Sequence, residues 1–280
     1  MARKRFDDDE DDDDRPRRSR RRDDDDDDYD ERPRRRRRKS ESGFPAWAWV
    51  AIPLGILLVC GGGLTLMMSS VQKVKSAGQS GKLRNNLKQV GIGLHAQHDT
   101  IGNFAVPFAL NDFKQPNPGL SWRVGILPFV EQDALYRQFD RSKRWDDPRN
   151  QFSSNQIVSA YSTPEEPVSP TFTRLFGFNG PGALMDANRK FPTKLTSVTD
   201  GLSNTAMVAE VTTGAPWASP MDVPYTRNGP LPSLGAAGND YFLLLLADGS
   251  VRNVKKNIPP AILHSLIQID DGQAINWDGF

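Results

Sequence analysis

The feature that most constrains this chain is an uncharged, largely apolar run from Phe44 to Met68, 25 residues long. As a helix rising about 1.5 Å per residue it would measure about 37 Å, which exceeds the roughly 30 Å hydrocarbon core of a bilayer. Trp47 and Trp49 stand at its start, where amphipathic aromatic rings favour the headgroup region, and Pro45 is tolerated in a first turn. We therefore expect residues 44–68 to form a transmembrane helix.

The charges on either side of this run predict its orientation. Positive charge gathers on the cytoplasmic side of a span. Seven basic residues stand just before the run, and four follow it at comparable range: Arg32, Arg34 to Arg38 and Lys39 before it, and Lys73, Lys75, Lys82 and Arg84 after it. We expect a single-pass protein of the inner (cytoplasmic) membrane, with a cytoplasmic N-terminus and an extracytoplasmic C-terminal domain, periplasmic in a bacterium.

Residues 1–41 form a tail of alternating acidic and basic blocks. They hold 16 basic and 17 acidic side chains in a chain whose formal net charge is +1. Because the tail has almost nothing to bury, it is expected to be disordered and cytoplasmic. Its last basic block, Arg32 to Lys39, lies where it can attract anionic lipid. Nucleic acid is not favoured, because neighbouring Asp runs compete with phosphate and no aromatic platform is interleaved.

Two alternatives to a membrane anchor fit this run less well. A cleaved signal peptide has an apolar region of about 7–15 residues that ends in small residues, and the run fits neither condition well. A lipoprotein processing site is faintly suggested by Leu57 to Gly61 around Cys60, but Val59 stands where a small residue is required. We interpret Cys60 as a buried structural cysteine. Since it is the only cysteine, no intrachain disulfide forms.

The remaining residues, 71–280, are enough for one folded extracytoplasmic domain. Leu83, Leu87, Val90 and Leu94 recur at helical spacing and predict an amphipathic helix to about residue 98. Whether this helix continues the membrane helix is left open, since glycines at 78 and 81 weaken helix continuity.

Further elements are predicted from turn and loop residues and from hydrophobic periodicity. Residues 105–120, rich in Pro, Asn and Gly, are predicted to form a loop, and 122–139 show a helical pattern broken near Pro128. Ala247-Asp248-Gly249-Ser250 between apolar runs predicts a hairpin turn. Strands are expected at 171–178, 206–211, 241–246 and 251–254, and a last helix at 260–269. The predicted fold class is α+β, a long N-terminal transmembrane helix continuing toward an antiparallel β-sheet domain.

An ordered set of motifs resembles a known family. The motifs are Leu83 to Gly91 with His95 and His98-Asp99, Ser121 to Val124 with Leu127 to Gln132, Trp145-Asp146, Thr199 to Thr205 with Glu210, and Ala247 to Arg252. From about residue 71 to 275 they resemble the bacterial family called domain of unknown function 1559, whose members look like pseudopilins. The resemblance implies a long N-terminal helix packed on an antiparallel sheet and export across the inner membrane. It carries no established activity and no catalytic residues.

The chain departs from the family pattern in two places. Family members resemble prepilins with a short leader, whereas here Gly43-Phe44 is followed by Pro45, and Ala48 stands where a glutamate is usual. This argues against processing by a prepilin peptidase and against assembly into a pilus-like fibre. The family's late histidine is also missing, because Gly238 and Asn239 occupy that region.

Several side chains are candidates for chemistry. His95, His98 and Asp99 could present two imidazoles and a carboxylate to a metal, but the pattern is interpreted as a satisfied or exposed pair, since no motif brings His264 near. Four carboxylates could form an acid–base pair or a calcium site: Asp200, Glu210, Asp222 and Asp248. Asp200 and Asp248 precede glycines and are better explained as turn residues.

Four tryptophans of the domain raise a binding hypothesis. Trp122, Trp145, Trp217 and Trp277 could form a sugar-stacking surface, although tryptophans are more often core residues. No catalytic, cofactor-binding or metal-binding residue is assigned, and no cofactor is expected. The sequence predicts a non-enzymatic, membrane-anchored structural or assembly protein of the cell envelope, with the bilayer and envelope proteins or its own copies as partners. The alternative is a periplasmic ligand-binding module, glycan being one candidate ligand.

Overall fold

The computed structural model describes residues 45–277 except 46, 105–106, 164–168 and 190–192. Within helix α1 (Ala48–Ile101), the side chains of 49 and 55–77 lie outside this description. The chain divides into two units, residues 1–59 and 60–280. The predicted disordered tail, 1–41, lies outside the described residues.

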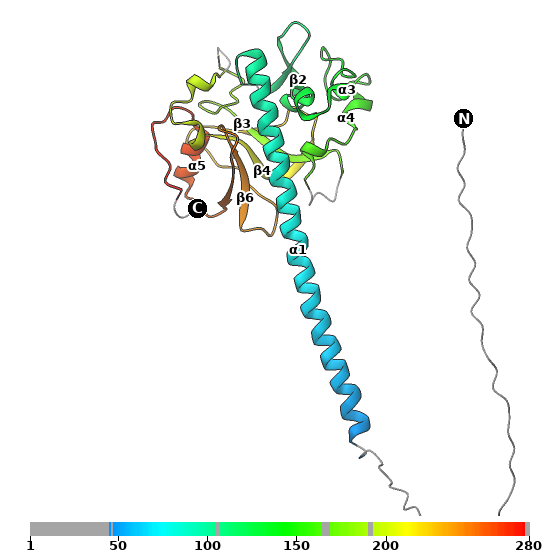
Figure 1. Ribbon diagram of the computed structural model, residues 1–280. Helices are drawn as coiled ribbons and strands as arrows, with labels where there is room; N and C mark the ends of the chain where they lie inside the picture. The colour runs from blue at the N-terminus through cyan, green and yellow to red at the C-terminus, as the bar shows by residue number, and fades with distance from the viewer. Residues whose placement is uncertain (1–44, 46, 105–106, 164–168, 190–192, 278–280) are drawn as a thin grey trace, which may run out of the picture. The chain divides into compact units, whose positions relative to one another are not determined.

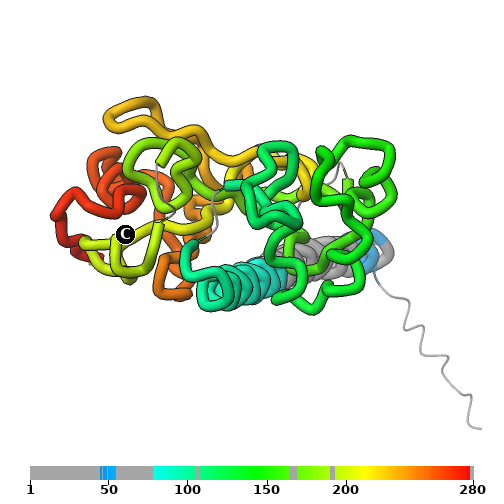
Figure 2. The backbone as a smooth tube through the Cα atoms, turned by 90° about the horizontal axis from the view of Figure 1, so that it is seen from above, coloured from blue at the N-terminus to red at the C-terminus, as the bar shows by residue number. Residues whose placement is uncertain are grey.

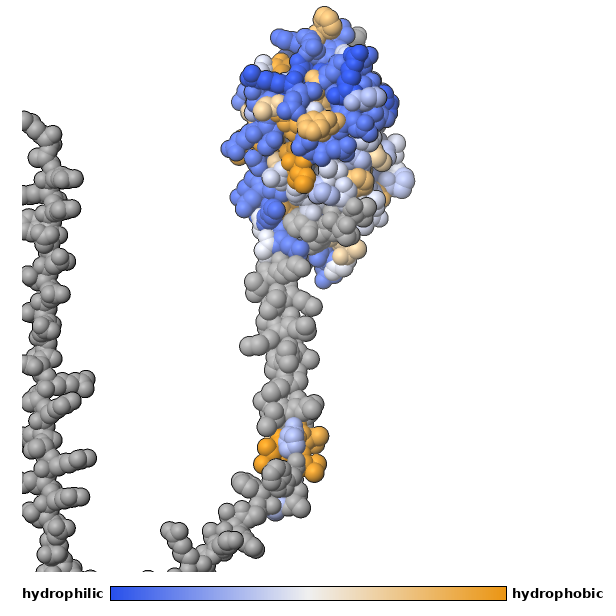
Figure 3. Space-filling model, turned by 90° about the vertical axis from the view of Figure 1, so that its right-hand side faces the viewer, coloured by the Kyte–Doolittle hydropathy of each residue, from blue (hydrophilic) through white to orange (hydrophobic). Residues whose placement is uncertain are grey.

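In the first unit, α1 begins with apolar side chains in contact with solvent. Trp47, Val50, Ile52 and Leu54 are between 53% and 69% exposed, and we call these four residues the apolar collar. Figure 3 shows hydrophobic residues, in orange, at this end of α1. Among side chains that the structure describes, no helix offers a stretch both long and apolar enough to cross a membrane. The structure does not describe the side chains of residues 55–68, which make up most of the expected span. The transmembrane span therefore stays a prediction.

In the second unit, α1 packs on the domain through the stripe that the sequence predicts. Leu83, Leu87, Val90 and Leu94 are buried. The helix ends at Ile101, three residues beyond the predicted end, and Gly102 follows in the left-handed region with φ 85°. Helix α1 runs without a break through the glycines at 78 and 81.

A five-stranded mixed sheet forms the centre of the domain (Figure 1). Its strands are β3 (Phe172–Asn179), β4 (Ala206–Pro216), β5 (Val223–Pro224), β6 (Tyr241–Leu246) and β7 (Val251–Lys255). They lie in the order β5-β3-β4-β6-β7. All neighbours are antiparallel except β5 and β3, which pair in parallel. The α+β class is confirmed, whereas a purely antiparallel sheet was wrong because the short β5 was not predicted.

Residues on the two faces of the sheet enter two separate cores. On β6, Leu243 and Leu245 join the core that contains the buried stripe of α1, whereas Leu244 and Leu246 join the core of α5 (Pro260–Ile267). This alternation follows from the two-residue period of a strand. Helix α1 therefore covers one face and α5 the other (Figures 1 and 2).

Residues 105–120 were predicted to form a loop, and this was wrong. They contain a two-stranded antiparallel ribbon, β1 (Phe108–Leu110) and β2 (Pro116–Ser121). The prolines at 116 and 118 are compatible with β2 because only one of its edges is paired. The amide of Asn117 ties β2 to a neighbouring loop by donating to the carbonyls of Arg141 and Lys143 at 2.9 and 2.8 Å.

Short helices connect the ribbon to the sheet. The helical pattern predicted over 122–139 is present as three short pieces that break around Pro128, as expected. They are α2 (Trp122–Gly125), η1 (Leu127–Val130) and α3 (Asp133–Tyr136). Four more follow along the chain: α4 (Gln151–Ser154), η2 (Ser159–Tyr161), η3 (Leu195–Ser197) and η4 (Leu202–Asn204).

The hairpin between β6 and β7 forms as predicted. Asp248 accepts a hydrogen bond from the Ser250 amide at 2.8 Å, and Gly249 has φ 82°. Asp248 therefore stabilises its own turn, and Gly249 occupies a backbone conformation that costs other residues about 1–2 kcal/mol.

Candidate functional site

A buried ion pair joins two segments that are far apart in the sequence. Arg123 Nη2 donates to Asp222 Oδ1 at 3.2 Å, and neither side chain is exposed to solvent. Arg123 comes from α2, and Asp222 precedes β5. Because an isolated buried charge is very costly, each of these two side chains requires the other.

Arg123 also completes an irregular part of the sheet. The register of β3 against β4 shifts between Thr173 and Leu175. There the Leu175 carbonyl accepts from Arg123 Nε and Nη2 at 3.0 and 2.5 Å, and the Leu175 amide donates to Thr173 Oγ1 at 3.1 Å. Side chains thus satisfy backbone groups at the bulge, as buried polar groups require.

The two oxygens of Asp222 have different surroundings. Oδ1 accepts from Trp122 Nε1 at 3.1 Å and from the Gly177 amide at 2.9 Å, in addition to Arg123. Oδ2 is buried without a hydrogen-bond partner among the described residues. Burial raises the pKa of Asp222, opposed by the charge of Arg123, and burial lowers the pKa of Arg123, opposed by Asp222.

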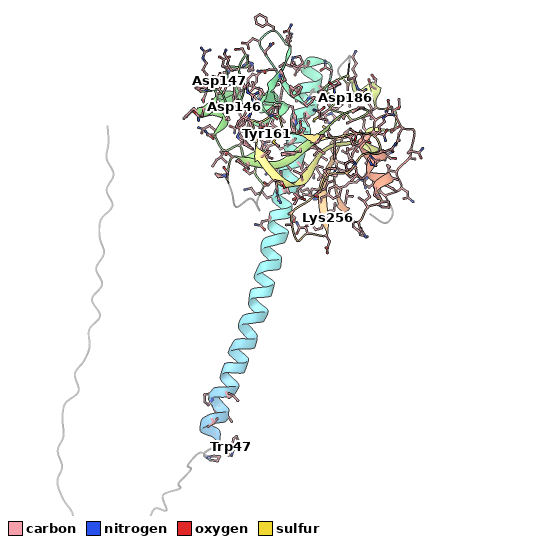
Figure 4. The ribbon with its side chains drawn as sticks, turned by 180° about the vertical axis from the view of Figure 1, so that it is seen from behind. Trp47, Asp146, Asp147, Tyr161, Asp186 and Lys256 are labelled. Atoms are coloured by element: carbon pink, nitrogen blue, oxygen red, sulfur yellow. The ribbon has the colours of Figure 1, made fainter. Side chains whose placement is uncertain are left out.

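Aromatic rings enclose the ion pair. The Arg123 guanidinium lies 4.5 Å from the centre of the Trp122 ring and 5.0 Å from that of Phe176. The Tyr161 hydroxyl donates to the Arg123 carbonyl at 2.6 Å, and burial raises the pKa of Tyr161. Figure 4 shows Tyr161 inside the domain. This polar centre is therefore sealed from solvent by its own neighbours.

A second buried ion pair crosses from β3 to β4. Arg174 Nη2 donates to Glu210 Oε1 at 3.1 Å, with side-chain exposures of 4% and 3%. Glu210 Oε2 accepts from the Leu243 amide on β6 at 3.3 Å. Glu210 borders a void of only about 10 Å³, which leaves no room for a substrate.

Asp200 and Asp248 have different roles, although the sequence suggested one for both. The Asp200 carboxylate accepts from the amides of Asp271 and Gly272 at 2.7 and 2.8 Å. It therefore holds a segment about 70 residues away, and the prediction that its side chain stabilises its own turn was wrong. The four candidate carboxylates serve separate structural contacts and do not converge.

The histidine pair packs around an aromatic side chain. The rings of His95 and His98 lie 5.6 and 4.9 Å from that of Phe104, centre to centre. Asp99 is 79% exposed at its side chain and lies 3.4 Å from His98 Nδ1. His264 pairs instead with the Tyr225 hydroxyl at 3.2 Å. No group of three or more His, Cys, Asp or Glu within the described ranges is arranged to hold a metal ion.

The four candidate tryptophans do not gather on one surface. Trp122 and Trp217 are buried in the core, and Trp145 packs at its edge. Trp277 is partly buried, packs against the other core and lies 4.4 Å from the Arg252 guanidinium. These positions agree with the core interpretation and argue against a sugar-stacking surface built from them.

Two larger cavities open elsewhere on the domain. One of about 480 Å³ lies between β6 and α5 and is bordered by Phe242, Lys256 and Leu263. Its one lysine is already committed, because Lys256 Nζ donates to the Ala236 carbonyl at 2.6 Å. The other, of about 430 Å³, lies between the end of α1, the β1–β2 turn and α3. We call this second space the α1–hairpin cavity.

Sequence reasoning did not identify Arg123 as a buried charge. The available signal was its isolation, since Arg123 is the only charged residue between Leu120 and Val130 in an otherwise largely apolar run. A lone charge in such a run predicts a buried partner. Its partner, however, lies 99 residues away and no spacing rule identifies it.

Comparison with known proteins gives one result. Residues 84–188 match the family model described as "Protein of unknown function (DUF1559)", which confirms the expected resemblance over that stretch. The stretch includes Arg123, whereas Asp222 lies beyond it. Neither the curated proteins nor the solved structures gives a match.

Proposed function

We propose that this chain is a non-enzymatic, single-pass structural or assembly protein of the cell envelope, with its folded domain outside the inner membrane. The observation that carries the proposal is the apolar collar of Trp47, Val50, Ile52 and Leu54, which is exposed around the start of α1. Large apolar side chains grouped on an exposed surface indicate an apolar partner. The collar lies at the start of the uncharged run 44–68. A bilayer would give both the collar and the run an apolar surrounding.

The organisation of the domain supports a scaffold. The buried charged pairs Arg123–Asp222 and Arg174–Glu210 hold the sheet together, and Asp200 holds the chain after α5. In this proposal the domain is pseudopilin-like, a long helix packed on a sheet, and the basic block Arg32 to Lys39 contacts anionic lipid.

The free edge of the sheet indicates how such a scaffold avoids unspecific pairing. β7 is an edge strand, and Arg84 of α1 donates to the Val251 carbonyl and to Asn253 Oδ1, each at 2.7 Å. Exposed Arg252 and Lys255 stand on the same strand. Charged side chains blunt an edge against strand addition, so we expect partners to bind elsewhere.

Protease protection tests the proposal. The full chain carries separate tags at residues 1 and 280 in intact cells, in cells with a permeabilised outer barrier, and in lysed cells. We expect the C-terminal tag to be cleaved once the barrier opens, and the N-terminal tag to be cleaved only after lysis. Loss of the N-terminal tag near Gly43 or Cys60 would replace the anchor with a processed leader. Cleavage of both tags only after lysis would place the domain inside.

A further inference from the structure

The α1–hairpin cavity combines an apolar floor with an excess of positive charge. Ile101, Leu110 and Phe129 line it together with three charged residues, Asp112, Lys114 and Arg141. Its volume of about 430 Å³ lies within the range of small-molecule sites, which pair apolar walls with a few polar groups.

The charges of the cavity do not cancel. Arg141 forms an ion pair with Asp112 and lies 4.5 Å from the centre of the Tyr136 ring. Lys114 forms no ion pair with any residue that the structure describes. One positive charge therefore remains for a ligand.

A hydrogen-bonded turn places the backbone of Lys114 at the rim of the cavity. Asn111 Oδ1 accepts from the amides of Phe113 and Gln115 at 2.9 and 3.0 Å, and the Lys114 amide donates to the Asn111 carbonyl at 3.0 Å. Lys114 itself has φ 57°, where glycine or asparagine would be less strained. A strained residue at the rim of a cavity motivates a functional hypothesis.

The opposite wall is also closely fitted. Gln97 is buried, and a Cβ at Gly125 would lie 2.8 Å from Gln97 Nε2. Oε1 of Gln97 has no hydrogen-bond partner among the described residues. Within the described part of the chain, Gln97 Oε1 is thus an unpaired hydrogen-bond acceptor at the cavity wall.

From these observations we propose that the α1–hairpin cavity binds a small organic anion, a molecule with an apolar body and one carboxylate. The apolar body contacts Ile101, Leu110 and Phe129, and the carboxylate lies beside Lys114. This site goes beyond the proposed anchoring role and does not depend on it.

Binding can be measured on the full chain in nanodiscs by ¹⁹F NMR. The probe is 4-(trifluoromethyl)phenylacetate, and its primary amide is the uncharged control of the same shape, with empty nanodiscs as the baseline. We expect saturable broadening for the carboxylate and binding at least about fivefold weaker for the amide, because only the carboxylate attracts Lys114. Equal binding of both probes, or none above the baseline, would overturn the proposal.

Matched variants locate the site. Lys114→Glu should weaken carboxylate binding about tenfold by reversing a nearby charge, whereas Lys88→Glu, on the exposed face of α1, should leave it unchanged. Ile101→Trp should fill the cavity and abolish binding, whereas Ile92→Trp, at a site 67% exposed, should not. Thermal midpoints within a few degrees establish that the variants are folded. Unchanged binding in both Lys114→Glu and Ile101→Trp would contradict the assignment.

Discussion

At the scale of single residues, the domain concentrates buried charge next to β3. Arg123 bonds the Leu175 carbonyl and pairs with Asp222, and Arg174 pairs with Glu210. Such pairs add little stability compared with apolar replacements, but removing one partner leaves an uncompensated charge. Their expected contribution is therefore to fix which segments meet.

The Asp222→Asn variant tests this expectation. The amide keeps the shape of the side chain but removes the charge, so we expect a loss of about 3–5 kcal/mol in the free energy of unfolding. Urea denaturation in detergent micelles, followed by tryptophan fluorescence, measures it. The control is Asp99→Asn at a side chain 79% exposed, expected to change stability by less than about 0.5 kcal/mol. A loss below about 1 kcal/mol at Asp222 would show that the pair is dispensable.

Lys114 allows a test of stability against binding. Glycine adopts its φ of 57° without a Cβ penalty, so Lys114→Gly should raise the free energy of unfolding by about 1 kcal/mol. The same change should weaken binding of the fluorinated carboxylate, because it removes the unpaired charge. The two measurements are a denaturation midpoint and a ¹⁹F titration. A gain in stability with unchanged binding would show that the strained backbone of Lys114 is not part of a binding site.

At the scale of elements, close backbone contact decides where glycine is required. A Cβ at Gly180 would lie 1.8 Å from the Tyr225 carbonyl oxygen, beside the pairing of β3 with β5. Gly180→Ala should therefore destabilise the domain by several kcal/mol, on the order of the larger single-residue effects.

Gly78 supplies the matched control for that substitution. A Cβ there would meet nothing within 4 Å, and Gly78 lies inside α1. Gly78→Ala should stabilise the helix by about 0.5–1 kcal/mol. Thermal melting by circular dichroism compares the two variants. Similar midpoints for Gly180→Ala and Gly78→Ala would show that the backbone at the β3–β5 pairing shifts to accommodate the extra methyl group at little cost.

The elements differ in how far the sequence predicts them. The β6–β7 hairpin and the α1 stripe were predictable because a turn at Asp248-Gly249 and a helical period at Leu83 to Leu94 are local signals. The β1–β2 ribbon was not, since its prolines and asparagines are typical of loops. Its position depends instead on tertiary hydrogen bonds, such as the one that the Asn117 amide donates to the Arg141 carbonyl. Likewise Asp222 has no local signal, because its role depends on a guanidinium 99 residues away.

At the scale of the whole molecule, the proposed anchor makes a prediction about membrane extraction. Substituting Ile56 and Leu58 with lysine places two charges near the middle of the run 44–68. Each charge costs about 2.5–3.5 kcal/mol at the centre of a span, so the double variant should move to the soluble fraction after alkaline carbonate treatment. Ile92→Lys, on the exposed face of α1, should stay in the pellet. Retention of both variants would contradict the anchor.

The wide separation of Arg123 and Asp222 has a consequence for biogenesis. Residues enter a folding compartment in chain order, and Arg123 precedes its partner by 99 residues. At a synthesis rate of roughly 5–20 residues per second, its guanidinium waits about 5–20 s before Asp222 arrives. During that interval the guanidinium at the β3 bulge lacks its carboxylate partner. The bulge of β3 can therefore be completed only after the chain has been synthesised as far as Asp222.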